Sequence, residues 1–145
     1  MIIRLSLKED KEALIQIFKR IKGINDYQKE IEFYFNNQAL FSLVDDDSVI
    51  GLCCLSYEID CVEIDYFAID SKYEGKGVAS FFLNEICSLL FNQSKTILLE
   101  VRSDNDKAIS LYERNGFKRY RVRKNYYVDN LSDAYCYKRE KKDER

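Results

Sequence analysis

The sequence predicts an α/β fold in which helices flank a mixed β-sheet. Three observations lead to this fold class. The chain has 145 residues, which is enough for one domain with a substantial core. Segments rich in β-branched and aromatic residues alternate with segments whose apolar residues recur at helical spacing. No repeat, linker or low-complexity segment divides the chain, so residues 1–145 are expected to form a single domain.

Short apolar or alternating segments predict seven strands, at Ile2–Leu5, Ala39–Val44, Ser48–Tyr57, Cys61–Ile69, Thr96–Arg102, Phe117–Arg123 and Ala134–Lys138. Apolar residues at helical spacing predict four helices, at about 7–22, 26–36, 77–92 and 106–114. A capping box at Ser6-Leu7-Lys8-Glu9 is expected to open the first helix. The charged segment from Arg139 to Arg145 is expected to fray.

The composition limits the partners and the kinds of site that the protein can have. The formal net charge is −2, which suggests neither a nucleic acid nor an anionic membrane as a partner. The absence of histidine excludes His-based triads and His-ligated metal sites, so no metal is expected. The five cysteines have no paired-ligand spacing and are expected to be buried thiols in a reducing compartment. Without a membrane-length apolar run or a signal peptide, the protein is expected to be cytoplasmic.

The most informative stretch runs from Phe67 to Ser80 and predicts a strand, a tight turn and the start of a helix. Gly75 and Gly77 permit a backbone that other residues would not tolerate. The free N–H groups of the following helix point back into the turn, which makes an anion site suited to phosphate. Lys72 and Lys76 flank this site. The glycine spacing fits neither a dinucleotide fingerprint nor a Walker loop.

The segment Glu74-Gly75-Lys76-Gly77-Val78-Ala79 resembles the acyl-CoA loop of the GNAT acetyltransferase superfamily, Arg/Gln-x-x-Gly-x-Gly/Ala. Glu74 departs from that pattern by placing an acid near a phosphate, and Lys72 and Lys76 are expected to offset it. The resemblance implies acetyl-CoA as cosubstrate. Its pyrophosphate would be wrapped by Gly75, Lys76, Gly77, Val78, Ala79 and Ser80, and its pantetheine arm would meet the backbone of Phe67, Ala68 and Ile69. The alternative is an ordinary glycine turn between a core strand and a core helix.

A second segment, from Leu99 to Phe117, resembles the C-terminal GNAT motif, Leu-Glu-Val-Arg followed by Asn-x-x-Ala-x-x-Leu-Tyr-x-x-x-Gly-Phe. The segment Arg123-Lys124-Asn125-Tyr126-Tyr127 resembles the Arg-x-Asn-Tyr-Tyr segment of the ribosomal-protein-alanine N-acetyltransferases, a RimI-like family. The match spans roughly Ile64 to Tyr127, whereas residues before Tyr57 match only in element order. It implies a single-domain GNAT fold, with about four helices flanking a mixed, mostly antiparallel sheet of six or seven strands.

The resemblance assigns roles to three side chains. Glu100 would be the general base, Tyr112 the general acid, and Asn105 a hydrogen-bond partner of the cofactor arm. Other readings stay open: Glu100 in an ion pair with Arg102 or a lysine, Tyr112 as a core tyrosine, and Asn105 as a helix cap. Glu63 and Asp65, on one face of the preceding strand, are rival bases.

Together these features predict an enzyme that transfers acetyl directly from acetyl-CoA to an amine. The acceptor expected from the resemblance is the N-terminal α-amine of a protein, such as the N-terminal alanine of a ribosomal protein. Two alternatives remain: a small-molecule amine as acceptor, such as an aminoglycoside or a polyamine, and a non-catalytic acyl-CoA-binding module. The oligomeric state is left open between a monomer and a weak dimer.

Overall fold

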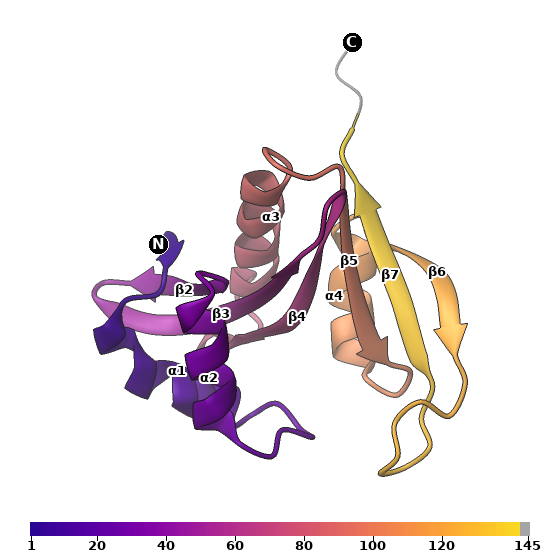
Figure 1. Ribbon diagram of the computed structural model, residues 1–145, viewed down its shortest axis with the longest axis horizontal. Helices are drawn as coiled ribbons and strands as arrows, with labels where there is room; N and C mark the ends of the chain where they lie inside the picture. The colour runs from indigo at the N-terminus through magenta and orange to yellow at the C-terminus, as the bar shows by residue number, and fades with distance from the viewer. Residues whose placement is uncertain (143–145) are drawn as a thin grey trace. The chain divides into compact units, whose positions relative to one another are not determined.

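The computed structural model describes residues 1–142 and confirms the predicted fold class. Its strands are β1 (Ile2–Leu5), β2 (Leu40–Asp45), β3 (Ser48–Tyr57), β4 (Cys61–Ile69), β5 (Thr96–Arg102), β6 (Lys118–Arg123) and β7 (Ala134–Glu140). Its helices are α1 (Lys11–Phe18), α2 (Tyr27–Asn36), α3 (Val78–Leu90) and α4 (Asp106–Arg114), with 3-10 turns η1 (Lys8–Asp10) and η2 (Ser71–Tyr73). Figure 1 shows this succession of elements.

The strands form a seven-stranded sheet in the order β1-β2-β3-β4-β5-β7-β6. β4 and β5 pair in parallel, with a register that runs from Cys61 opposite Thr96 to Ile64 opposite Leu99. The pairs β1–β2, β2–β3, β5–β7 and β6–β7 are antiparallel. The sheet is therefore mixed and mostly antiparallel, as predicted.

The chain packs into two compact units. The first unit comprises residues 1–56 and 65–86, and the second comprises residues 57–64 with the chain from residue 87 onward. β4 contributes its first half to the second unit and its second half to the first. The single domain over residues 1–145 stays a prediction.

In the first unit, the second half of β4 is packed on both faces. The Tyr66 ring lies 4.9 Å from the ring of Phe18 in α1, measured between centroids. The next side chain, Phe67, stacks on Phe82 of α3 at 5.0 Å. Because successive side chains of a strand point to opposite faces, α1 and α3 cover opposite sides of this strand. The strand thereby orients the turn that follows Ile69.

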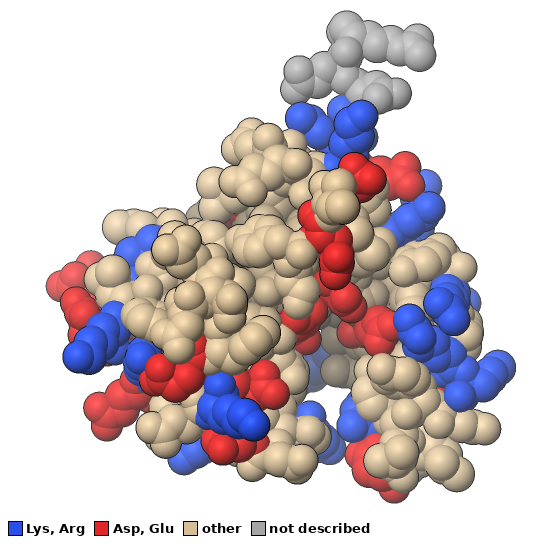
Figure 2. Space-filling view, in the orientation of Figure 1, with Lys and Arg blue, Asp and Glu red and all other residues tan. Residues whose placement is uncertain are grey.

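The second unit is built on β5, β7 and β6, with α4 packed against them (Figure 1). Its core is aromatic and aliphatic: Tyr137 and Phe117 are almost completely buried, and Tyr112 of α4 packs edge-on against Phe117 at 5.8 Å. The outermost strand, β6, has the sequence KRYRVR and is largely exposed. Figure 2 shows Lys and Arg gathered over it. Charged side chains of this kind discourage an edge strand from pairing with other chains.

The start of the first helix differs from the prediction. Asp10, and not Glu9, closes the turn, because its Oδ2 accepts the Leu7 N–H at 2.7 Å. The Ser6 hydroxyl instead pairs with Ser42 Oγ at 2.7 Å, so the predicted capping box is wrong. α1 also ends at Phe18, four residues before the predicted end. At the other end of the chain, Arg139 and Glu140 belong to β7, and residues 143–145 of the predicted frayed end lie outside the described residues.

Asp10 is the only charged residue among those described that is buried, and its carboxylate ties three elements together. Arg4 Nη1 of β1 lies 2.5 Å from Asp10 Oδ2, and Ser42 Oγ of β2 donates to the same oxygen at 3.1 Å. Burial raises the pKa of Asp10, but the hydrogen bonds from Arg4, Leu7 and Ser42 outweigh it and hold the pKa below its usual value.

We predict that Asp10→Asn lowers the free energy of unfolding by about 2–4 kcal/mol, because it leaves Arg4 without its counter-charge. A folded-state pKa below the unfolded one contributes stability above about pH 4, which is lost as the pH falls through the folded pKa. Urea denaturation between pH 2 and pH 7 should therefore show a steeper acid loss in the wild type than in Asp10→Asn. Glu9→Gln, at an exposed neighbouring acid, is the control. Equal acid profiles in the wild type and Asp10→Asn would contradict the role of this carboxylate.

Candidate functional site

The glycine turn has the backbone that its sequence predicts. β4 ends at Ile69, η2 follows, and α3 begins at Val78. Gly75 and Gly77 have φ angles of +75° and +78°, in the left-handed region that disfavours side chains. A Cβ built on either glycine would meet no atom within 4 Å. The glycines are therefore required by backbone conformation, and the space beside them is open to a ligand.

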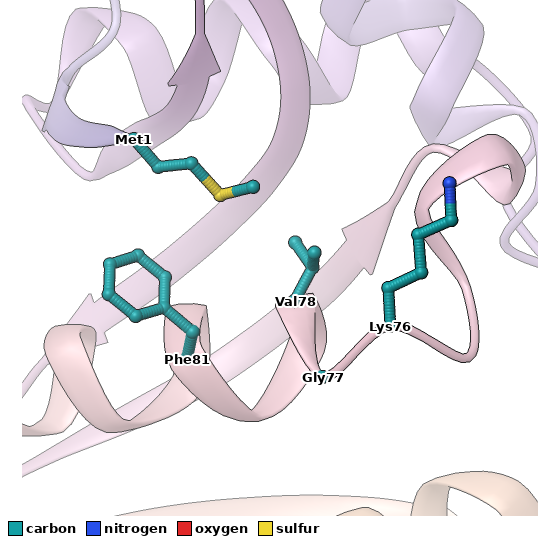
Figure 3. Close-up of a pocket in the computed structure, with 5 residues that line it drawn as sticks. All are labelled: Met1, Lys76, Gly77, Val78 and Phe81. Atoms are coloured by element: carbon teal, nitrogen blue, oxygen red, sulfur yellow. The ribbon is translucent and has the colours of Figure 1, made fainter.

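A shallow pocket of about 300 Å³ lies at the start of α3. Figure 3 shows its five lining residues, which are Met1, Lys76, Gly77, Val78 and Phe81. The Lys76 ammonium group lies 5.9 Å from the centre of the Tyr73 ring. The pocket therefore combines one cation, a helix N-terminus and apolar side chains. This is chemistry that fits a phosphate group attached to an apolar arm.

Glu74 lies in this turn, and its charge partner is one that sequence analysis missed. Arg20 Nη2, just after α1, is 2.5 Å from Glu74 Oε1. Arg20 is therefore a charge partner of Glu74 that the sequence did not predict, and the expected offset by Lys72 and Lys76 stays a prediction. Nothing in the sequence indicates this pair, because its members are 54 residues apart.

The end of β4 presents backbone to the same region. The register of β4 with β5 ends at Ile64, so Phe67 and Ala68 are outside that ladder. The Ile69 carbonyl accepts a hydrogen bond from Arg20 Nη1. The contacts of a pantetheine arm with the backbone of Phe67, Ala68 and Ile69 stay a prediction. The Ile69 carbonyl oxygen already has a hydrogen-bond donor in Arg20.

Glu100 lies in β5 on the half-exposed face of the strand, in alternation with buried Leu99 and Val101. Its Oε1 is 2.8 Å from Arg123 Nε of β6 and 3.5 Å from Cys136 Sγ of β7. The ion pair that sequence analysis left open therefore forms, but with Arg123. Arg102 instead lies 2.7 Å from Asp129 and over the Tyr127 ring at 4.0 Å.

The contact between Arg123 and Glu100 is close but poorly directed. Arg123 Nε is buried, and its N–H has no acceptor in hydrogen-bond geometry among the described residues. The attraction is therefore mainly coulombic, and the Glu100 carboxylate has lone pairs left to accept further hydrogen bonds. Burial raises the pKa of the Cys136 thiol, so this sulfur stays protonated at neutral pH and is not a nucleophile. Burial and the charge of Glu100 also raise the pKa of Tyr127.

Tyr112 and Asn105 occupy α4 and its start. The Tyr112 ring is buried against Phe117, as the core-tyrosine reading expects. Asn105 Oδ1 accepts the Ala108 N–H at 3.2 Å, which confirms the helix-cap reading. A catalytic role for Tyr112 and a cofactor contact for Asn105 stay predictions. The glycine turn and the end of β4 belong to the first unit, whereas Glu100, Asn105 and Tyr112 belong to the second.

The two rival bases have different settings. Asp65 Oδ2 accepts from Tyr34 Oη of α2 at 2.7 Å and from Ser56 Oγ of β3. Burial and this bond to Asp65 raise the pKa of Tyr34, so its hydroxyl stays a donor. Asp65 thus joins α2, β3 and β4, which is a structural role. Glu63 stands opposite Leu98 of β5 in the parallel register.

The family model for the acetyltransferase (GNAT) family matches residues 11–117. This range includes the glycine turn and the Leu99–Phe117 segment, whereas the Arg123–Tyr127 segment lies beyond it. The chain belongs to the GNAT acetyltransferase family.

Individual relatives agree with this family. The N-alpha-acetyltransferase RimI of Mycobacterium tuberculosis is 37% identical over 81 residues, which are 56% of this chain and 50% of that protein. The N-alpha-acetyltransferase 30 of Schizosaccharomyces pombe is 32% identical over 120 residues, which cover 77% of this chain and 79% of that protein. The crystal structure of Ard1 from Thermoplasma volcanium is 27% identical with a TM-score of 0.86, and 98% of each chain is covered. The resemblance to RimI-like GNAT enzymes is therefore confirmed.

Three further solved GNAT-like structures contain CoA, acetyl-CoA or a CoA-containing bisubstrate analogue. They are 19–20% identical to this chain, with TM-scores of 0.69–0.82, so they show the fold alone. In the described part of the GNAT chain, no three His, Cys, Asp or Glu side chains are grouped to hold a metal ion. No helix of residues 1–142 is long and apolar enough to cross a membrane.

We predict that Tyr34→Phe lowers the free energy of unfolding of this GNAT protein by about 1–2 kcal/mol, because Asp65 loses one of two hydroxyl donors. Ser56→Ala should cost a similar amount, and the double variant should differ from the sum because both hydroxyls share one oxygen. Urea denaturation measures each value. Tyr27→Phe, in the first turn of the same helix, is the control and should change stability by less than about 0.5 kcal/mol. A neutral Tyr34→Phe would show that Asp65 does not tie these elements together.

Proposed function

We propose that this GNAT protein transfers acetyl from acetyl-CoA to the N-terminal α-amine of a protein, with the N-terminal alanine of a ribosomal protein as the model acceptor. The observation that carries the proposal is the contact of Glu100 with Arg123. Arg123 opens the segment that resembles the ribosomal-protein-alanine enzymes, and it lies beside the carboxylate that the family motif assigns as base. The names of the relatives, both N-alpha-acetyltransferases, support the same acceptor class.

The glycine turn supports acetyl-CoA as the donor, which would supply an acetyl group activated as a thioester. The left-handed glycines leave open space beside the turn, and Lys76 with the first turn of α3 offers positive charge to phosphate. Gly75, Lys76, Gly77, Val78, Ala79 and Ser80 would hold this part of the cosubstrate.

Proton transfer is the task of the protein side chains. An α-ammonium group has a pKa of roughly 8, so most of the acceptor must lose a proton before it can attack. Glu100 would take this proton, directly or through a water molecule. The new bond joins the amine nitrogen to the acetyl carbon, and the bond between that carbon and sulfur breaks. Tyr112 would donate a proton to the departing sulfur.

An acceptor panel tests the proposal. The protein is incubated with acetyl-CoA and peptides that begin with alanine, serine or methionine, and thiol release is followed. An alanine peptide with a blocked N-terminus and a free lysine is the matched control. The proposal expects turnover of the free alanine peptide and none of the blocked one. Turnover of spermidine or an aminoglycoside alone would contradict it in favour of a small amine. Binding of acetyl-CoA without any turnover would favour the non-catalytic module.

We predict that Gly77→Asp weakens acetyl-CoA binding by more than about 10-fold, because it adds a side chain and a negative charge beside the proposed phosphate site. Calorimetry measures the affinity. Gly116→Asp is the control, since Gly116 has a φ of +87° and carries the same backbone strain at the end of α4. If Gly77→Asp binds as the wild type does while folded, the glycine turn is not the cosubstrate site.

We further predict that Glu100→Gln and Tyr112→Phe each lower kcat by about 10²–10⁴-fold, with different pH dependences. The loss in Glu100→Gln should be largest at neutral pH and smallest at high pH, where the amine is already neutral. The loss in Tyr112→Phe should persist across the range, because the leaving sulfur still needs a proton. Both variants should retain acetyl-CoA binding in calorimetry. If Glu63→Gln loses activity while Glu100→Gln keeps it, Glu63 and not Glu100 is the base.

A further inference from the structure

Arg20 contacts Glu74 in the glycine turn of the proposed phosphate site, although it lies outside the motifs that carry the resemblance. We propose that Arg20 is a ligand of the phosphate groups of acetyl-CoA, and that Glu74 and the Ile69 carbonyl hold it in place. The inference rests on the proposed use of acetyl-CoA and names a further binding residue for it. It explains how the turn tolerates an acid where the family pattern has Arg or Gln.

Two contacts fix the guanidinium group of Arg20. Nη1 donates to the Ile69 carbonyl at the end of β4, and Nη2 lies 2.5 Å from Glu74 Oε1 in the turn. The residue itself is held by a turn that continues α1, where its N–H donates to the Ile17 carbonyl at 3.1 Å. All four residues belong to the first unit. The side chain is thus anchored at both ends before any ligand arrives, which reduces the entropy lost on binding.

The anchored group retains donors for a ligand. A guanidinium group has five N–H donors, and the two contacts leave three of them without a partner among the described residues. The Arg20 side chain is 38% exposed, so part of it is accessible to a solute. The planar fork of N–H groups matches the oxygens of phosphate, which a lysine can only meet as a point charge.

The charge balance of the turn gives Arg20 a specific task. From Asp70 to Gly77 the turn carries two acids and two lysines, so by itself it has no net charge. Arg20 adds the positive charge that makes the site attractive to an anion. Without Arg20, Glu74 would lose this ion pair and keep its negative charge in the turn that is proposed to hold the phosphates. A cation from the segment after α1 therefore replaces the one that the family pattern places at the position of Glu74.

If the ion pair of Arg20 with Glu74 were purely structural, removal of Arg20 would change stability and not affinity for acetyl-CoA. Ion pairs between side chains as exposed as these contribute about 0–1 kcal/mol to folding. Removal of Arg20 should therefore change stability little and affinity strongly. The ion pair of Lys11 with Glu32 is the control, because it lies in the same unit, joins α1 to α2 at 2.8 Å, and has an equally exposed carboxylate.

Calorimetry with acetyl-CoA in 50 mM and 300 mM NaCl tests the proposal. Arg20→Ala should bind about 10–100-fold more weakly than the wild type at low salt, the loss expected for a charge-assisted hydrogen bond. The loss should shrink at high salt, since screening weakens exposed charges. Lys11→Ala should bind within about 2-fold of the wild type at both salt concentrations. Arg20→Lys should fall between the wild type and Arg20→Ala.

A second variant separates a phosphate ligand from a structural tie. On the Arg20→Ala background, Glu74→Arg should restore most of the affinity, because it returns a cation to the position that the family pattern uses. Glu74→Gln on the same background should restore a smaller part by removing a negative charge from the turn. If Arg20→Ala binds as Lys11→Ala does, or if its loss is equal at both salts and Glu74→Arg does not recover it, Arg20 is not a phosphate ligand.

The Arg20 inference and the proposed function fail in different ways. If the wild type does not bind acetyl-CoA, the proposed function falls and the Arg20 assignment falls with it. If the wild type binds, Gly77→Asp does not, and Arg20→Ala is unchanged, only the Arg20 assignment falls.

Discussion

The packing of β4 on both of its faces is the constraint on which the first unit of this GNAT protein depends. Tyr66 faces α1 and Phe67 faces α3, so neither face of the strand can turn without loss of a ring contact. The strand therefore delivers the chain into the glycine turn in a fixed direction. Gly75 and Gly77 then adopt backbone angles that carry the chain into α3, whose first N–H groups point back into the turn. The packing of β4 and the backbone angles of the two glycines therefore set the geometry of the candidate phosphate site.

Four carboxylates make hydrogen bonds or ion pairs with residues from other elements of the structure. Asp10 joins β1 to β2 through Arg4 and Ser42, and Asp65 joins α2 to β3 through two hydroxyls. Glu74 holds Arg20, and Glu100 lies beside Arg123. The first two accept several hydrogen bonds from neighbouring elements and act as structural ties. Glu100 differs, because its contact with Arg123 Nε lacks hydrogen-bond geometry, and its role as the base stays a proposal.

The elements of the fold were predicted well where local patterns are strong. β3, β4, β5 and α4 have the predicted bounds, since alternation or helical spacing is unbroken along each of them. The prediction failed at the first helix, where Ser6-Leu7-Lys8-Glu9 satisfies the capping-box pattern. Ser42 on β2 captures the Ser6 hydroxyl, and Arg4 orients Asp10 to close the turn. Ser42 is 36 residues away from Ser6 along the chain, so a local pattern could not reveal that contact.

The sequence by itself determined the family and the glycine turn, because both depend on residues that are adjacent in the chain. Left-handed glycines, a helix start and the Leu99–Phe117 motif are local features that need no tertiary information. Only the tertiary structure decided the charge partners. Arg20 reaches Glu74 across 54 residues, and Arg123 displaces Arg102 as the partner of Glu100 because β7 brings β6 and β5 together. Electrostatic partners are set by distance in space, and pairing between distant strands and helices fixes that distance.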